Sequence, residues 1–475
     1  MNNAFNVFFT KLFDTYESAF PIRKKKIKSN LINAPWITPQ LKRCIRKKYL
    51  LFNLLRRGLI ERRQFNKYKN TLTWLINKIR RRYYYYKFNA CKEDCKQTWS
   101  NVNTLLKRKL RDTVRKVVTE EGQVMEGIHM LDYFNDYFTS VVSRLTENMP
   151  IAINFIFFLN NIPPVAQSCF FAPTDENEVN TILRSLPNKG NSLLDVKPRL
   201  LSMVSNIVVP LIVYLYNLGI SNGLYPDLLK LGRVAPVFKA GEVTKVNNYR
   251  PISILSTINK IFEMLTFKRM MTFIEYHNII SNLQYGFIKG RSTTQAIFRF
   301  VSDVMKTFHS KTYNIALFLD LTKAFDTVNR DILMHKLSLY GFRGVTNMFL
   351  SSYMTNRQQY VYMSGLKSNV KPICTGVPQG SVLGPLLFNL FINDIVNICD
   401  CDKVLFADDA VFYVSASDLK LCIEKVKILN HKISEWLENN KLVPNVIKTK
   451  LMLFTPRHVE SLLDIFQWRT TRVGF

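Results

Sequence analysis

Two adjacent carboxylates, Asp408 and Asp409, stand between two apolar runs in the last quarter of the chain. Val404–Phe406 precedes them and Ala410–Tyr413 follows them. Strand-like apolar runs on both sides of a short polar stretch predict a β-hairpin with the acids at its tip. Adjacent negative charges repel each other, so such a tip favours a bound cation, although an ordinary polar turn is the alternative.

A third carboxylate, Asp320, ends another β-type run, Ile315–Leu319. If the two strands pair at the centre of one sheet, Asp320 and Asp408 converge at one end of it. Asp409 should then point elsewhere, because neighbours on a strand alternate in direction. Two carboxylates can hold two divalent ions about 3.5–4 Å apart, which stabilises the attacking and leaving oxygens in phosphoryl transfer. Ligands that are all oxygen favour Mg²⁺, with Mn²⁺ possible.

The elements around these acids follow a regular order. A helix is predicted after Asp320, then a turn-rich block, a second helix, the carboxylate hairpin, a long helix and a final strand. Their ranges are 323–341, 376–381, 383–395, 404–413, 418–439 and 450–455. This order is typical of an antiparallel sheet backed by helices, the split βαβ arrangement of α+β proteins.

The composition points to a polyanionic partner. The 475 residues include 66 Lys and Arg against 35 Asp and Glu, a net charge of +31. This excess favours nucleic acid over an acidic membrane surface, and no membrane partner is expected. Val204–Ile220 predicts a buried helix, because it is interrupted and short for a bilayer span. The eight scattered cysteines predict free thiols in a reducing, intracellular compartment.

The first 120 or so residues carry basic clusters at near-helical intervals, with aromatic residues between them. They include Arg23–Lys28, Lys47 with Lys48, and Arg80, Arg81 and Arg82, which Tyr83–Tyr86 follows. We expect a helical arm that follows a phosphate backbone, with the aromatic rings available for stacking. A solvated helix face is the alternative for each single residue.

Four blocks in the second half of the chain occur in an order and spacing that resemble the reverse transcriptase of non-LTR (LINE-type, jockey-like) retrotransposons. They are Phe318–Asp320 with Ala324–Asp326, Gly376–Pro385, Phe406–Asp409, and Asn440–Leu442 with Lys448 and Thr449. Upstream, Asn248–Ser253, Lys260–Glu263, Gln284–Phe287 and Gly290–Thr293 match the fingers blocks of that family. Pro35–Thr38 resembles the connector before its polymerase, so the resemblance covers about residues 35–455.

The resemblance implies an RNA-directed DNA polymerase with the right-hand fold of fingers and ferredoxin-like palm. It implies two Mg²⁺ ions, an RNA template, a DNA primer or target, deoxynucleoside triphosphates, a separate endonuclease, and a location in cytoplasm and nucleus. The implied domains are a basic helical extension (1–150), a connector (151–172), fingers (173–300), palm (301–456) and an unassigned tail (457–475). The thumb is expected to be absent or incomplete, and the alternative function is a catalytically inactive, nucleic-acid-binding remnant.

The resemblance also assigns roles to single residues. Asp320 and Asp408 would bind the metal ions, with Asp409 completing the carboxylate set, and Lys448 would be a general acid near the leaving pyrophosphate. The residues implied to contact the nucleotide are Lys239 and Arg250 on the triphosphate, Phe325 as steric gate against the 2′-hydroxyl, and Gln379 and Gly380 against the base. Two departures from the family pattern are the altered loop 189–196 and Pro444, which stands where leucine is usual.

Overall fold

The computed structural model describes residues 1–21, 35–92, 94–106, 114–147, 149, 162–187 and 196–455. It contains two compact units, one formed by Met1–Phe20 with Val114–Phe475 and the other by Pro21–Thr113. The expected extension 1–150 is therefore divided between the two units. Three predicted features lie wholly or largely outside the described residues: the basic run 23–28, the altered loop 189–196 and the tail 457–475. Of the expected connector 151–172, only 162–172 is described.

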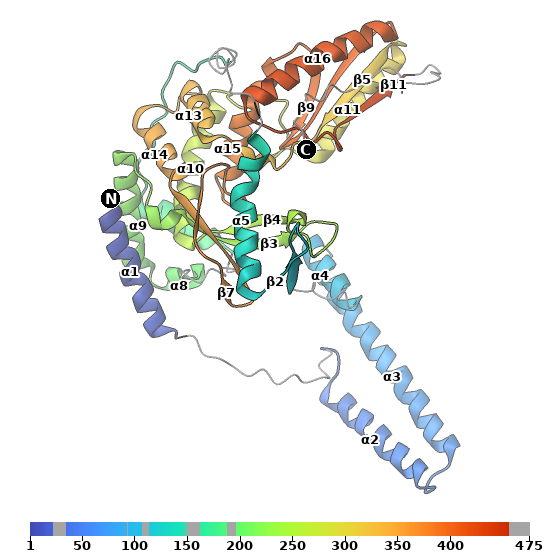
Figure 1. Cartoon of the computed structure of the whole chain (residues 1–475). Coiled ribbons are helices and arrows are strands. Elements are labelled where there is room, and N and C mark those ends of the chain that lie inside the picture. The colour runs from blue at the N-terminus through green and yellow to red at the C-terminus, as the bar shows by residue number, and fades with distance from the viewer. Residues whose placement is uncertain are drawn as a thin grey trace. The chain divides into compact units, whose positions relative to one another are not determined.

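The smaller unit consists of helices α2 (Pro39–Arg56), α3 (Arg62–Asn89) and α4 (Cys95–Leu105). Thr38 begins α2 by accepting the N–H of Leu41 at 3.2 Å. Helices α2 and α3 pair as a hairpin (Figure 1), where the Phe52 and Phe65 ring centroids are 5.8 Å apart. The basic clusters at Lys47–Lys48 and Arg80–Arg82 thus lie on helices, as their spacing predicts.

The larger unit contains a four-stranded sheet of β5 (Tyr313–Leu319), β9 (Asp402–Phe406), β10 (Asp409–Ala416) and β11 (Lys450–Phe454). The strand order is β11-β5-β10-β9, and every neighbouring pair is antiparallel. In chain order this is 4-1-3-2, the split βαβ arrangement that the sequence predicts. The two acid-bearing strands, β5 and β10, are central neighbours.

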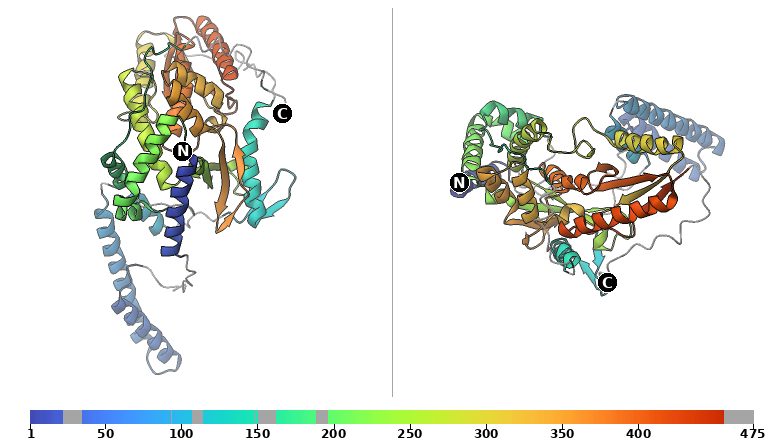
Figure 2. Two further views of the ribbon diagram at one scale, coloured as in Figure 1. Left: turned by 90° about the vertical axis from the view of Figure 1, so that its left-hand side faces the viewer. Right: turned by 90° about the horizontal axis from the view of Figure 1, so that it is seen from above.

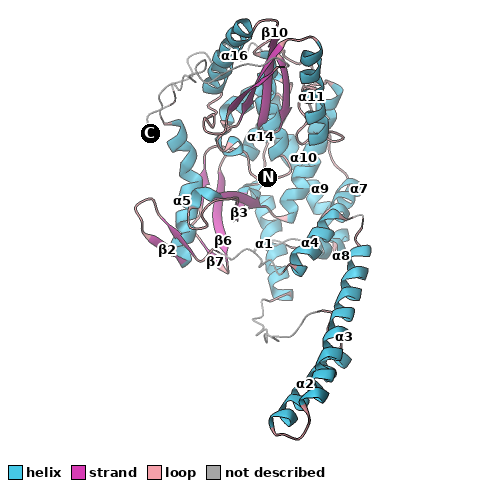
Figure 3. Cartoon of the chain, turned by 90° about the vertical axis from the view of Figure 1, so that its right-hand side faces the viewer, coloured by secondary structure: helices cyan, strands magenta, loops and turns pink. Residues whose placement is uncertain are grey.

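Helices cover both faces of this sheet, as Figures 2 and 3 show, with α11 (Thr293–His309) on one side and α16 (Leu419–Asn439) on the other. The alternation along the strands explains the two faces. Ala316 and Tyr413 are buried in a small cluster with Ala296 of α11. The residues next to them on each strand, Leu317 and Phe412, point to the opposite face and belong to the main core with α16.

The main core also contains the helices between β5 and β9. They are α12 (Ala324–Thr327), α13 (Arg330–Leu339), α14 (Gly344–Met354), α15 (Gly384–Ile392) and the 3₁₀ helix η3 (Asn393–Asn397). The prediction of one helix over 323–341 is wrong, because Val328 leaves the helical region with ψ 116°. Asn329 then begins α13 by accepting the N–H of Ile332 at 3.0 Å.

A second sheet has five strands. They are β3 (Leu231–Phe238), β4 (Tyr249–Ile254), β6 (Arg357–Met363), β7 (Leu366–Lys367) and β8 (Lys371–Ile373). Strand β6 pairs in parallel with β3 and brings residues far apart in the chain together. Helix α5 (Gly127–Thr146) packs on β6, and the small hairpin of β1 (Lys116–Val118) and β2 (Val124–Glu126) lies beside it.

The remaining helices enlarge the main core. They are α1 (Asn2–Ala19), α7 (Glu176–Ser185), α8 (Pro198–Met203), α9 (Ser205–Asn222), α10 (Thr257–Tyr276) and the 3₁₀ helix η1 (Asp227–Lys230). The 3₁₀ helix η2 (Val246–Asn248) instead contributes Val246 to a smaller cluster with α5 and the second sheet. The apolar run 204–220 forms α9, with Ile212 and Tyr216 fully buried, as predicted. Among the described residues, no helix combines the length and apolarity that a bilayer span requires.

Candidate active site

The three predicted carboxylates gather at one end of the four-stranded sheet. Leu319 pairs with Ala410, and Phe406 pairs with Asp409 across a two-residue turn that contains Asp408. Loss of hydration and the negative charges of Asp408 and Asp320 raise the pKa of Asp409 above its ordinary value. The Asp409 side chain is exposed, whereas Asp408 is half-buried.

Asp320 fits a cation-binding role. Its Oδ2 atom is buried and accepts no hydrogen bond from the described residues, and Lys448 Nζ lies 3.4 Å away. Its backbone is fixed, since its N–H donates to Thr449 Oγ1 at 3.3 Å and its carbonyl accepts the N–H of Asn445 at 2.8 Å. In the described part of the chain no group of three or more His, Cys, Asp or Glu side chains forms a metal cluster. The assignment of Asp320 and Asp408 as metal ligands stays a prediction.

Three cations lie near these acids, as the sequence predicts. The pKa of Lys239 is lowered overall by loss of hydration and by the charges of Lys448 and Arg250, although the charges of Asp320 and Asp408 act in the opposite direction. Lys239 follows β3 and Arg250 lies on β4, and both side chains are exposed. Exposed cations beside carboxylates suit a ligand that carries phosphates and bound metal ions.

The ring of Phe325, the predicted steric gate, is fixed by other aromatic rings. It stacks on Phe388 with centroids 4.3 Å apart and planes 23° apart, and it meets the edge of Phe287 at 6.1 Å. The short helix α12 that carries it follows Lys323, whose φ of 49° turns the chain sharply after β5. A ring held on two sides has few alternative rotamers, which suits a steric role.

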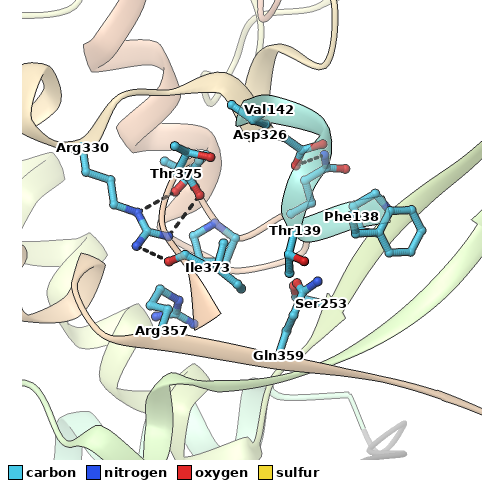
Figure 4. Close-up of a pocket in the computed structure, with 15 residues that line it drawn as sticks. Phe138, Thr139, Val142, Ser253, Asp326, Arg330, Arg357, Gln359, Ile373 and Thr375 are labelled. Atoms are coloured by element: carbon cyan, nitrogen blue, oxygen red, sulfur yellow. Dashed lines mark hydrogen bonds between the residues drawn. The ribbon is translucent and has the colours of Figure 1, made fainter. Parts of the chain in front are cut away.

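The loop 376–381 places Gln379 and Gly380 between β4 and α12. Gln379 accepts the N–H of Ser253 on its carbonyl at 2.7 Å, and its Nε2 donates to Asp326 Oδ1 at 2.7 Å (Figure 4). Gly380 has φ +101°, and a Cβ there would lie 2.7 Å from the Ser253 carbonyl oxygen. A side chain at this position would therefore displace the loop.

Sequence reasoning missed the two groups that hold this loop. Arg330 donates to the carbonyls of Ile373, Thr375 and Gly376 at 2.7, 3.1 and 3.2 Å, in the pocket shown in Figure 4. Its position inside the helix predicted over 323–341 gave no signal of this role.

Glu263, the second of these groups, is fully buried at the other end of the loop. It accepts the N–H of Val382 at 2.7 Å, the hydroxyl of Tyr353 at 2.7 Å and Asn259 Nδ2 at 3.0 Å. Burial raises the pKa of Glu263. The available signal was its place in Lys260–Glu263, one of the blocks that match the fingers of the family.

The residues predicted to bind nucleic acid lie on the smaller unit. Lys47, Arg80, Arg81 and Arg82 are exposed, and Lys48 is half-buried. Helices α2 and α3, which carry them, contain no Asp or Glu. Exposed rings accompany the charges: Lys78 Nζ lies 4.7 Å from the centre of the Trp74 ring, and the Arg82 guanidinium 5.7 Å from that of Tyr86.

Comparisons with a protein family and with individual proteins both identify similarity to reverse transcriptases. Residues 238–472 match the family described as reverse transcriptase (RNA-dependent DNA polymerase). The RNA-directed DNA polymerase from mobile element jockey of Drosophila melanogaster is 29% identical over 292 residues, which cover 59% of this chain and 32% of that protein. The probable RNA-directed DNA polymerases from transposon BS and transposon X-element of the same species are 28% and 29% identical. These alignments cover 62% and 60% of this chain and 33% and 32% of those proteins. The chain thus spans about a third of the length of these relatives.

Proposed function

Because this chain carries a reverse transcriptase domain of the jockey-like, non-LTR class, we propose that it adds deoxynucleotides to a primer 3′-hydroxyl on an RNA template. The observation that carries the proposal is the convergence of Asp320 and Asp408 with Lys239, Arg250 and Lys448 at one sheet end. That combination joins metal-binding oxygens to phosphate-binding cations. The similarity to the jockey protein, which is named as an RNA-directed DNA polymerase, supports the same proposal.

In the proposed reaction, Asp320 and Asp408 would hold two divalent ions, Mg²⁺ or Mn²⁺, which stabilise the charge on the attacking and leaving oxygens. The side chains of Lys239 and Arg250 bind the triphosphate oxygens. Lys448 Nζ, beside Asp320, donates a proton to the leaving pyrophosphate. The exposed carboxylate of Asp409 completes the carboxylate set, and its pKa is raised by loss of hydration and then by the charges of Asp408 and Asp320.

Nucleotide selection is proposed to depend on Phe325, Gln379 and Gly380. The ring of Phe325, held by Phe388, would crowd a ribose 2′-hydroxyl and so favour deoxynucleotides. Gln379 and Gly380 lie in a loop with a fixed backbone, which suits contact with the incoming nucleotide and the template base.

The smaller unit is proposed to bind the phosphate backbone of RNA or DNA through Lys47, Lys48 and Arg80–Arg82. Two helices without acids give a high local positive charge, and their exposed rings suit stacking on bases. A separate protein or domain would supply the nick that primes synthesis, and the reaction would take place in cytoplasm or nucleus.

Primer extension on poly(rA)/oligo(dT) with Mg²⁺ tests the proposal. The wild-type chain should incorporate dTTP, and Asp408→Asn should lose at least about 100-fold of that rate because a metal ligand is removed. The matched control is Asp402→Asn, an exposed acid at the other end of β9, which should retain full activity. Equal incorporation by wild type and Asp408→Asn would refute the assigned site. RNA binding without any incorporation would favour the nucleic-acid-binding alternative.

A further inference from the structure

The turn that carries Asp408 has an unfavourable backbone. Ala407 and Asp408 form a two-residue turn between the paired residues Phe406 and Asp409, and Ala407 has φ +56°. Glycine or asparagine normally takes such a position, because a Cβ makes positive φ costly. The turn therefore needs support from outside the hairpin if Asp408 is to stay in one position.

That support comes from the buried amide of Gln284, which is 2% exposed. Its Oε1 atom accepts two backbone N–H groups, that of Ala407 at 2.9 Å and that of Gly286 at 2.8 Å. Both partners are donors, so the amide oxygen must face them. The Nε2 atom is buried and has no hydrogen-bond partner among the described residues. Gln284 therefore supports the turn through its side-chain oxygen, which accepts both hydrogen bonds.

The segment that carries Gln284 is joined to β9 like an additional strand. Leu405 N–H donates to the Leu283 carbonyl at 2.9 Å, and Tyr285 N–H donates to the Leu405 carbonyl at 2.8 Å. Gly286 is so close to the backbone of Ala407 that a Cβ there would collide with the Ala407 nitrogen. The absence of a side chain at Gly286 thus permits the contact between Gln284 and the turn.

Two polar side chains fix this segment in turn. Arg291 Nη1 donates to the carbonyls of Asn282 at 2.9 Å and Gln284 at 2.6 Å. Asn389 Nδ2, on α15, donates to the carbonyl of Gly286 at 2.9 Å. The backbone carbonyls of Gln284 and Gly286 are therefore both held, which positions the Gln284 side chain as an acceptor for Ala407.

We propose that Gln284 is a positioning residue for nucleotide addition. By accepting the N–H of Ala407 it holds the turn at positive φ, and so keeps the Asp408 carboxylate facing Asp320. This inference rests on the proposed function and extends it to a residue that touches neither substrate nor metal. Loss of the contact should affect the chemical step more than nucleotide binding, because a displacement of about 1 Å costs on the order of 100-fold in rate.

The test compares Gln284→Met, which keeps length and volume but removes the acceptor, with a matched control in the same sheet. The control is Asn314→Leu at the far end of β5. Asn314 is 1% exposed, donates to Ser415 Oγ at 3.0 Å and, like Gln284, has one amide atom without a described partner. Hydrogen exchange of the Ala407 amide, measured by mass spectrometry on peptides spanning 404–410, reports the contact without any need for activity.

We expect Gln284→Met to speed exchange at Ala407 at least tenfold and to lower kcat about 10- to 100-fold, with KM for dTTP changed less than threefold. Asn314→Leu should change neither. If Gln284→Met does not fold, Gly286→Ala, which forces the segment away from the turn, replaces it with the same expectation. Unchanged exchange, or a kcat equal to that of Asn314→Leu, would overturn the positioning role alone. Absence of incorporation by the wild-type chain would refute the proposed function as well.

Discussion

A buried ion pair between α13 and η3 gives the sharpest stability prediction. Lys336 Nζ donates to Asp394 Oδ1 at 2.5 Å and to the Phe391 carbonyl at 2.7 Å. The two charged side chains are 1% and 4% exposed. Asp394 also accepts Trp436 Nε1 of α16 at 3.0 Å. The pair thus joins three elements that support the four-stranded sheet.

Replacing Lys336 by Met leaves the Asp394 charge buried, with Trp436 Nε1 as its remaining side-chain partner among the described residues. Removal of one partner from such a pair costs about 3–5 kcal/mol, a large share of the roughly 5–15 kcal/mol that stabilises a typical protein. The double variant Lys336→Met with Asp394→Asn removes the unpaired charge and keeps an acceptor for Trp436. It should recover at least about half of the loss.

Urea unfolding of the full chain, followed by circular dichroism, measures these differences. The matched control is Lys306→Met, which breaks an ion pair with Asp303 at 2.7 Å whose lysine side chain is 76% exposed. That change should cost less than about 1 kcal/mol. A loss of stability in Lys336→Met no larger than that in Lys306→Met would show that the buried pair contributes no more than an exposed one.

Three further predictions concern selectivity, loop geometry and pH. Phe325→Val should lower the preference for dTTP over UTP at least about tenfold in kcat/KM, because a smaller side chain admits the 2′-hydroxyl; an unchanged ratio would exclude the gate. Gly380→Ala should raise KM for dTTP, since its Cβ would lie 2.7 Å from the Ser253 carbonyl, and a wild-type KM would contradict this. Burial raises the pKa of Glu178, but hydrogen bonds from Arg269, Lys268 and Thr174 outweigh this effect and lower the pKa to about 2. The stability from this lowered pKa is present above the ordinary Glu pKa and is lost as the pH falls from about 5 to about 2. Glu178→Gln should lack that acid sensitivity in unfolding experiments between these pH values, and an unchanged profile would argue against it.

The sheet that carries the carboxylates was predictable from the sequence alone. Val404–Phe406 and Ala410–Tyr413 are short, apolar and separated by a polar turn, so local pattern and tertiary structure agree there. Asp320 was predictable for the same reason, because it directly follows the buried strand β5. The association of β5 with β10 followed from the order of elements.

The sequence did not predict features that depend on contacts between distant segments. The charges of Lys336 and Asp394 look like solvated surface residues until the helices that bury them are placed together. Gln284 likewise has no local pattern that would link it to Ala407, which is 123 residues away. The break at Val328 was missed because apolar spacing continues through it. In the structure, the carbonyls of Phe325 and Val328 accept the N–H groups of Val377 and Gly376, so the helical hydrogen bonds do not continue there.

We propose that the ends of β5 and of the β9–β10 hairpin share one divalent-metal site. Iron-mediated cleavage tests it directly: Fe²⁺ with a reductant, bound in place of Mg²⁺, generates hydroxyl radicals that cut the nearest backbone. A shared site should give two sets of cuts, around Asp320 and around Asp408, both suppressed by excess Mg²⁺ and both lost in Asp320→Asn. Cuts at only one of these segments, or cuts that Asp320→Asn leaves intact, would contradict it.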